Sequence, residues 1–131
     1  MSVMTALTFI GKIHSSLKRL EDCPLQEREN APQATAEILP EFVEALSHLK
    51  PGDEIILLTW LHKADRSVLS TRPRNDPKAP MTGVFATRSP DRPNPIGMHT
   101  ARVVSLEKNM LKVSGLEVLD GTPLVDIKVA L

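Results

Sequence analysis

Residues 53–62, with the sequence DEIILLTWLH, contain one of the longest apolar runs in the chain. Isoleucine, threonine and tryptophan favour extended backbone, and an apolar run of this length is typical of a strand buried in a sheet. The Pro51-Gly52 pair directly before the run ends any preceding helix. The run therefore predicts a central strand over 53–62.

On the C-terminal side of this strand, a polar and proline-rich stretch gives way to a series of strand-like segments. Residues 63–82 are expected to form a long loop. Short apolar segments separated by turn residues predict strands at 83–87, 98–106, 110–119 and 123–130. Residues 107–109 and 120–122 are typical of hairpin turns, and Gly115 predicts a bulge within 110–119.

On the N-terminal side, a first strand at 6–14 is predicted by apolar or small residues at alternate positions: Leu7, Phe9, Gly11 and Ile13. A loop over 15–33 and a short strand at 34–39 are expected to follow. Pro40 is a favourable first residue for a helix. One short helix up to about residue 49 is predicted by apolar residues at helical spacing: Phe42, Ala45, Leu46 and Leu49.

Several short strands with a single helix indicate a mainly β fold, either a compact antiparallel β-barrel or a strongly bent sheet. The chain has 131 residues, of which 41% are hydrophobic, and this length is that of a single domain. No apolar run is long enough to span a bilayer, and the N-terminus lacks the features of a signal peptide. Cys23 is the one cysteine, so no intrachain disulfide can form and a cytoplasmic location is expected.

Charge and proline are concentrated in the middle of the chain. Residues 63–102 carry eight lysines and arginines against three aspartates, a net charge of +5, so the remainder carries −5. Six of the eleven prolines fall within 73–95. A basic segment on an otherwise acidic chain indicates an anionic partner for that segment, although a solvated charged surface has the same composition.

The stretch GVFATRSPDRPNPIG, at 83–97, predicts a rigid cationic binding loop. Its three prolines fix φ and restrict the residues before them, so that Arg88, Arg92 and Asn94 are held in a fixed arrangement. Guanidinium groups suit carboxylate or phosphate oxygens, and an asparagine amide both donates and accepts hydrogen bonds. The chain has neither a GxGxxG nor a GxxxxGK[ST] motif. No metal site is expected, because the four histidines are scattered: His14, His48, His62 and His99.

The 83–97 stretch, followed by LEVLDGTPLVDIK at 116–128, resembles the signature of the TsaA-like proteins, which include the TrmO-type tRNA methyltransferases. The similarity extends to FIGKIHS at 9–15, to Pro24 and Gln26, to the TWLH strand end and to RPR at 72–74. It implies one TsaA-like β-barrel domain over 1–131, without the C-terminal extension of longer members. It also implies an S-adenosylmethionine-dependent enzyme, usually a homodimer with the cofactor near the subunit interface, that methylates N6 of threonylcarbamoyladenosine beside the anticodon of tRNA.

Carried over by motif position, the resemblance implies these cofactor contacts: Gln26, Glu27, Arg28, His62, Lys63, Arg88, Met98, Glu117, Val118, Leu119 and Asp120. Arg88 is suited to the methionine carboxylate or the adenosine, and Asp120 to a ribose hydroxyl or the ammonium group. Three residues remain as catalytic, substrate-facing candidates: Arg92, Asn94 and Asp126. Asp126 or water is the base that removes the proton from the attacking nitrogen.

Two segments depart from the pattern of the family. Ser47-His48-Leu49 is followed by Lys50-Pro51-Gly52, where members often run directly into the central strand, and Asp126-Ile127-Lys128 is not followed by Pro-Tyr. Two alternatives therefore stay open: a methyltransferase acting on a small molecule or another substrate, and a non-catalytic regulatory module that binds S-adenosylmethionine or RNA.

Overall fold

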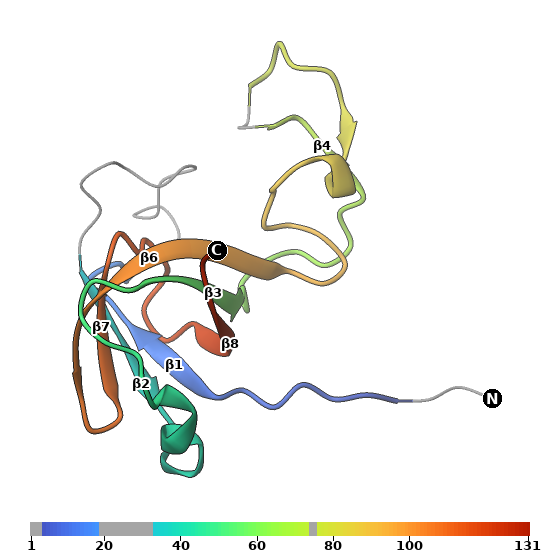
Figure 1. Cartoon of the computed structure of the whole chain (residues 1–131). Coiled ribbons are helices and arrows are strands. Elements are labelled where there is room, and N and C mark those ends of the chain that lie inside the picture. The colour runs from blue at the N-terminus through green and yellow to red at the C-terminus, as the bar shows by residue number, and fades with distance from the viewer. Residues whose placement is uncertain (1–3, 19–32, 74–75) are drawn as a thin grey trace.

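The structure is a computed structural model that describes residues 4–18, 33–73 and 76–131 (Figure 1). Six strands form one antiparallel sheet in the order β1-β2-β7-β6-β3-β8, and β1 pairs with β8 as well as with β2, so the sheet closes into a barrel. The prediction of a mainly β, antiparallel fold with little helix is confirmed. The strands are β1 (Gly11–His14), β2 (Ala34–Ile38), β3 (Glu54–Trp60), β6 (Ile96–Glu107), β7 (Met110–Ser114) and β8 (Pro123–Val129).

The predicted central strand is confirmed as β3, which pairs with β6 on one side and β8 on the other. Its residues alternate between the two faces of the sheet, as a strand requires. Ile55, Leu57 and Thr59 are buried in the interior, whereas Leu58 and Trp60 lie half-buried on the outer face. The end of this strand therefore presents an indole at the surface.

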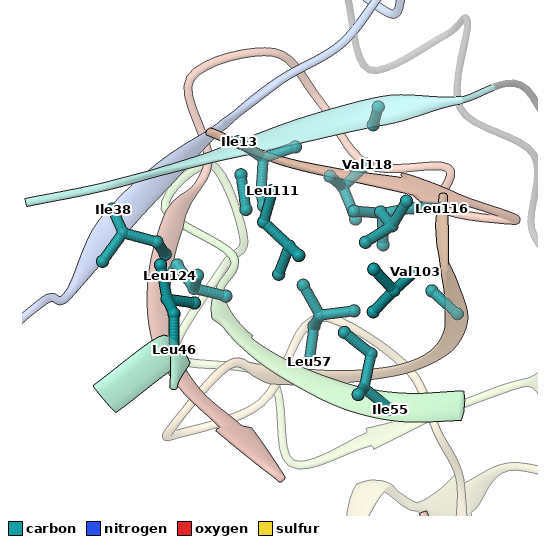
Figure 2. Packing of buried hydrophobic residues seen from close by; sticks show 14 residues of the cluster. Ile13, Ile38, Leu46, Ile55, Leu57, Val103, Leu111, Leu116, Val118 and Leu124 are labelled. Carbon is teal, nitrogen blue, oxygen red and sulfur yellow. The ribbon is translucent and has the colours of Figure 1, made fainter. Parts of the chain in front are cut away.

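The interior of the closed sheet is filled by aliphatic side chains (Figure 2). Ile13, Leu57, Leu111 and Leu124 are fully buried there, and each comes from a different strand. At roughly 25 cal/mol per Å² of apolar area, this burial is the main contribution to stability. The core therefore fixes the strand register, and with it the positions of the loops between strands.

The predicted first strand at 6–14 is wrong in its first half. β1 begins at Gly11, because its neighbour β2 ends opposite it, at Ile38. Leu7 and Phe9 are 52% and 38% exposed. Residues 4–9 extend away from the sheet as an N-terminal arm (Figure 1).

The predicted helix begins at Pro40 as expected but is a short 3-10 helix, η2 (Pro40–Leu46). It ends before residue 49 because Ser47 has a non-helical ψ of 131° and His48 has a left-handed φ of 76°. Leu46 is buried, and Phe42 and Leu49 pack against the core. Ala45, which was predicted on the same face, is exposed, so the spacing identified three of the four face residues but not the helix type.

The predicted strand at 83–87 is also wrong. Only Thr82–Gly83 is extended, as β5, which pairs with β4 (Ser70–Thr71) inside the predicted loop, and a 3-10 turn, η4 (Val84–Ala86), follows. Gly115, with a φ of 84°, follows the last residue of β7 instead of forming a bulge within 110–119. The irregularity in this hairpin lies in β6, between Val103 and Ser105.

Candidate functional site

Residues 61–95 leave the sheet after β3 and return at the start of β6, and we call this segment the excursion. It carries the small β4–β5 sheet and projects away from the closed sheet (Figure 1). Its two ends are joined by a hydrogen bond from the backbone N–H of Leu61 to the carbonyl of Pro95, 2.8 Å long. The 83–97 stretch therefore forms the returning half of the excursion.

Side chains join the two halves of the excursion near its base. The Asp91 carboxylate accepts the backbone N–H of Asp65 at 2.8 Å. Arg66 donates from Nε to the carbonyl of Pro93 at 2.7 Å and from Nη2 to Oδ1 of Asn94 at 3.2 Å. These contacts place residues 63–67 beside residues 91–94, although the two segments are more than twenty residues apart in sequence.

Arg92 braces the loop from within. Its Nε donates to the carbonyl of Ser89 at 2.8 Å, and its Nη2 donates to the carbonyls of Val84 and Thr87 at 2.5 and 2.6 Å. Hydrogen bonds from a charged donor are stronger than neutral ones. The rigidity predicted from the prolines is thus reinforced by an arginine for which the sequence predicted a catalytic, substrate-facing role.

Three of the implied cofactor contacts are exposed at the excursion. His62 and Lys63 form a turn directly after β3, and Arg88 lies between η4 and the Arg92 brace. Lys63 is two residues from Asp65 and Arg88 is three residues from Asp91, so the Asp65–Asp91 contact brings their segments together. This part of the excursion thus presents several cations to solvent.

Met98 and Asp126 lie in one row on the outer face of the sheet. Leu58 of β3 pairs with Met98 of β6 on one side and with Asp126 of β8 on the other. Directly paired residues of an antiparallel sheet point to the same face. Asp126 also makes a 3.6 Å ion pair with Lys128. The register therefore places Met98, a predicted cofactor contact, and Asp126, a predicted catalytic residue, on either side of Leu58. No pattern in the sequence indicated this arrangement.

The implied contacts at 117–120 form a second group beside the end of β1. Glu117 and Val118 are buried, and the Val118 carbonyl accepts a hydrogen bond from the Ser15 hydroxyl at 2.7 Å. The Asp120 carboxylate accepts the Ser15 backbone N–H at 2.8 Å and pairs with Lys18 at 2.9 Å. The hydrogen bond from the Ser15 N–H lowers the pKa of Asp120 most, and the hydrogen bond from Lys18 lowers it further.

The two groups lie towards the same end of the sheet, because β3 ends where β8 begins, with Thr59 paired to Leu124. Gln26, Glu27 and Arg28 lie outside the described residues. In the described part of the chain no cluster of three or more histidine, cysteine, aspartate or glutamate side chains is arranged to hold a metal ion. No helix among the same residues is long and apolar enough to cross a membrane.

Residues 12–130 match the family of tRNA-methyltransferase O N-terminal domains. Over 126 residues the chain is 40% identical to a probable S-adenosyl-L-methionine-binding protein of Archaeoglobus fulgidus, covering 96% of this chain and 34% of that protein. It is 42% identical over 102 residues to a putative S-adenosylmethionine-dependent methyltransferase of Pseudomonas aeruginosa, covering 75% of this chain and 44% of that protein.

The crystal structure of TrmO from Pseudomonas aeruginosa is similar in fold, with a TM-score of 0.74 and 33% identity. The match covers 98% of this chain and 57% of that one. The chain thus spans between about a third and just over half of the length of these three proteins. With a family match over nearly its whole length and the same fold as TrmO, the chain belongs to the tRNA-methyltransferase O N-terminal domain family.

Proposed function

We propose that the protein is an S-adenosylmethionine-dependent methyltransferase that methylates N6 of threonylcarbamoyladenosine beside the anticodon of tRNA. The observation that carries the proposal is the family match over 12–130, which includes the braced 83–97 loop. Relatives named for binding S-adenosylmethionine and for methyl transfer support the cofactor and the reaction class. The tRNA substrate follows from the name of the family.

The charged groups of the site fit the cofactor. Arg88 is exposed and offers a guanidinium to the methionine carboxylate. His62 and Lys63 precede Asp65, whose backbone N–H is hydrogen-bonded to Asp91 in the segment that carries Arg88. Asp120 has a lowered pKa and is therefore ionised at neutral pH, as a partner for an ammonium group or a ribose hydroxyl must be. Gln26, Glu27, Arg28, Met98 and the backbone of 117–119 complete the proposed contacts.

The cofactor supplies a methyl group already activated by a sulfonium, so the protein has to align the reacting atoms and remove one proton. We assign proton removal from the attacking nitrogen to Asp126, whose carboxylate lies on the outer face in the row with Met98. Asn94 is assigned to the substrate, with its amide oxygen oriented by Arg66. Arg92 is assigned a positioning role, because its hydrogen bonds hold the loop that carries Arg88.

The exposed apolar side chains of the excursion support a homodimer with the cofactor near the subunit interface. Leu69, Met81 and Phe85 are 69%, 58% and 84% exposed. Apolar side chains gathered on a projecting segment are typical of a protein–protein interface. A cytoplasmic location belongs to the same proposal, since tRNA is modified there.

A non-catalytic S-adenosylmethionine-binding module is the second candidate. It is favoured by the name of the Archaeoglobus fulgidus relative, which records binding alone. A methyltransferase with a small-molecule substrate would have the same cofactor site.

Calorimetric titration with S-adenosylmethionine tests the cofactor site that all three candidates share. We expect saturable binding to the wild-type protein and its loss in Arg88→Ala, with an unchanged circular dichroism spectrum. Arg72→Ala, which removes another exposed arginine of the excursion, is the matched control and is expected to bind normally. Unchanged affinity in Arg88→Ala would contradict the assignment of the loop.

A further inference from the structure

An open groove of about 510 Å³ lies between the N-terminal arm and the base of the excursion. Its volume is in the range of small-molecule sites. One wall is apolar and comes from the arm, and the other carries an aromatic side chain, an arginine and an amide. The lining residues that matter are Leu7, Phe9, Trp60, Arg66, Asn94 and Ile96. Of these six residues, only Asn94 has a role in the proposed function.

The aromatic wall of the groove is a fixed stack of an indole and a guanidinium. The Arg66 guanidinium carbon lies 5.1 Å from the centroid of the Trp60 ring, within the range of a cation–π contact. The bonds from Arg66 to Pro93 and Asn94 hold the guanidinium in place. Because Arg66 is exposed and lines the groove, a planar ligand can stack on the guanidinium or on the indole.

The amide of Asn94 is oriented by the same arginine. Arginine can only donate hydrogen bonds, so the Asn94 atom that accepts from Nη2 is the oxygen Oδ1. The amino group Nδ2 therefore remains as the donor of this side chain. The groove thus combines a stacking surface, a positive charge and an oriented donor.

We propose that this groove binds a nucleobase of the RNA substrate, stacked on Trp60 and Arg66 and hydrogen-bonded through a ring nitrogen or carbonyl to Asn94. Unstacked bases of single-stranded RNA are bound in this way, on aromatic rings and arginine planes. The net charge of +5 over 63–102 attracts the phosphates on either side of the base. The choice of RNA as ligand rests on the proposed function.

Trp60 is the one tryptophan of the chain, so its fluorescence reports directly on this groove. We would titrate the protein with a six-nucleotide oligoadenylate, and with a linear polyphosphate of the same charge. Saturable quenching of Trp60 by the RNA and none by polyphosphate is expected. Arg66→Lys keeps the charge but loses the planar stack and the hold on Asn94, so its affinity should fall about tenfold. Arg102→Lys, an exposed arginine outside the groove, should bind like the wild type.

Four results of the ligand titrations would overturn the proposal: no quenching by the RNA, equal quenching by polyphosphate, equal affinity in Arg66→Lys, or reversal of quenching by S-adenosylmethionine. The last would assign the groove to the cofactor. A shift in Trp60 emission that depends on protein concentration alone would likewise overturn it, because a second copy would then occupy the groove. Calorimetry with S-adenosylmethionine is expected to be unchanged in Arg66→Lys. If the wild-type protein does not bind S-adenosylmethionine but the RNA still quenches Trp60, the proposed function is refuted and the groove assignment stands.

Discussion

Replacement of Arg92 by lysine tests whether one side chain holds the 84–92 loop in place. The guanidinium reaches three backbone carbonyls, at 2.8, 2.5 and 2.6 Å. A lysine keeps the charge but is a point donor that lacks the planar fork. Each bond from a charged donor contributes about 1.5 kcal/mol, and this value is discounted because Arg92 is half-buried. The loss of two bonds then costs about 2 kcal/mol. This cost corresponds to a roughly 30-fold larger population of the open loop.

Hydrogen exchange followed by mass spectrometry measures that population, because exchange of a protected amide follows local opening. We expect roughly 30-fold faster exchange in peptides covering 84–92 of Arg92→Lys, and unchanged exchange in peptides from β3. Arg72→Lys is the control, since Arg72 is an exposed arginine of the same excursion. Unchanged exchange in the loop of Arg92→Lys would refute the bracing role.

Further predictions concern the Asp120 pair and the core. Because the Ser15 N–H and Lys18 lower the pKa of Asp120, its ionised form stabilises the fold above pH ~4, and this contribution is lost as the pH falls through the lowered pKa. In urea denaturation, Asp120→Asn should be less stable than the wild type at pH 6 by up to about 1 kcal/mol, and this difference should shrink as the pH is lowered below ~4; an undiminished difference would contradict this. Gly11→Ala should prevent folding or destabilise by about 3 kcal/mol, since its Cβ would overlap a backbone oxygen of β2, and wild-type stability would refute the strand pairing there. Leu57→Ala, at a fully buried position, should lower the free energy of unfolding by about 2–5 kcal/mol in the same assay, and a loss below 1 kcal/mol would contradict its place in the core.

The sequence predicts most of the sheet because its strands carry alternating or continuous apolar residues. The predicted strands at 53–62, 98–106 and 123–130 correspond to β3, β6 and β8. Leu7 and Phe9 have the same alternation, yet they lie on the exposed arm. Alternation shows that a segment can form a strand, but pairing depends on where the neighbouring strand ends, and β2 ends at Ile38, opposite Gly11.

The site is predicted less completely than the sheet. The prolines of 83–97 indicated a rigid loop, whereas the bracing by Arg92 depends on carbonyl positions that the sequence does not specify. From the sequence, Arg66 was counted among the basic residues of 63–102, and no role was predicted for it. Its contact with Asn94 joins segments that are distant along the chain, and its contact with Trp60 depends on how the chain turns after β3. Cross-strand and loop–loop contacts of this kind depend on register, and register is fixed by the packed core.

Methyl transfer to tRNA is the most direct test of the central claim. The protein would be incubated with S-adenosylmethionine carrying a labelled methyl group and with tRNA that contains unmethylated threonylcarbamoyladenosine. The tRNA nucleosides would then be analysed by mass spectrometry. We predict label on N6 of threonylcarbamoyladenosine with the wild type and none with Arg88→Ala. Absence of label with a wild-type protein that binds S-adenosylmethionine would contradict the proposed function.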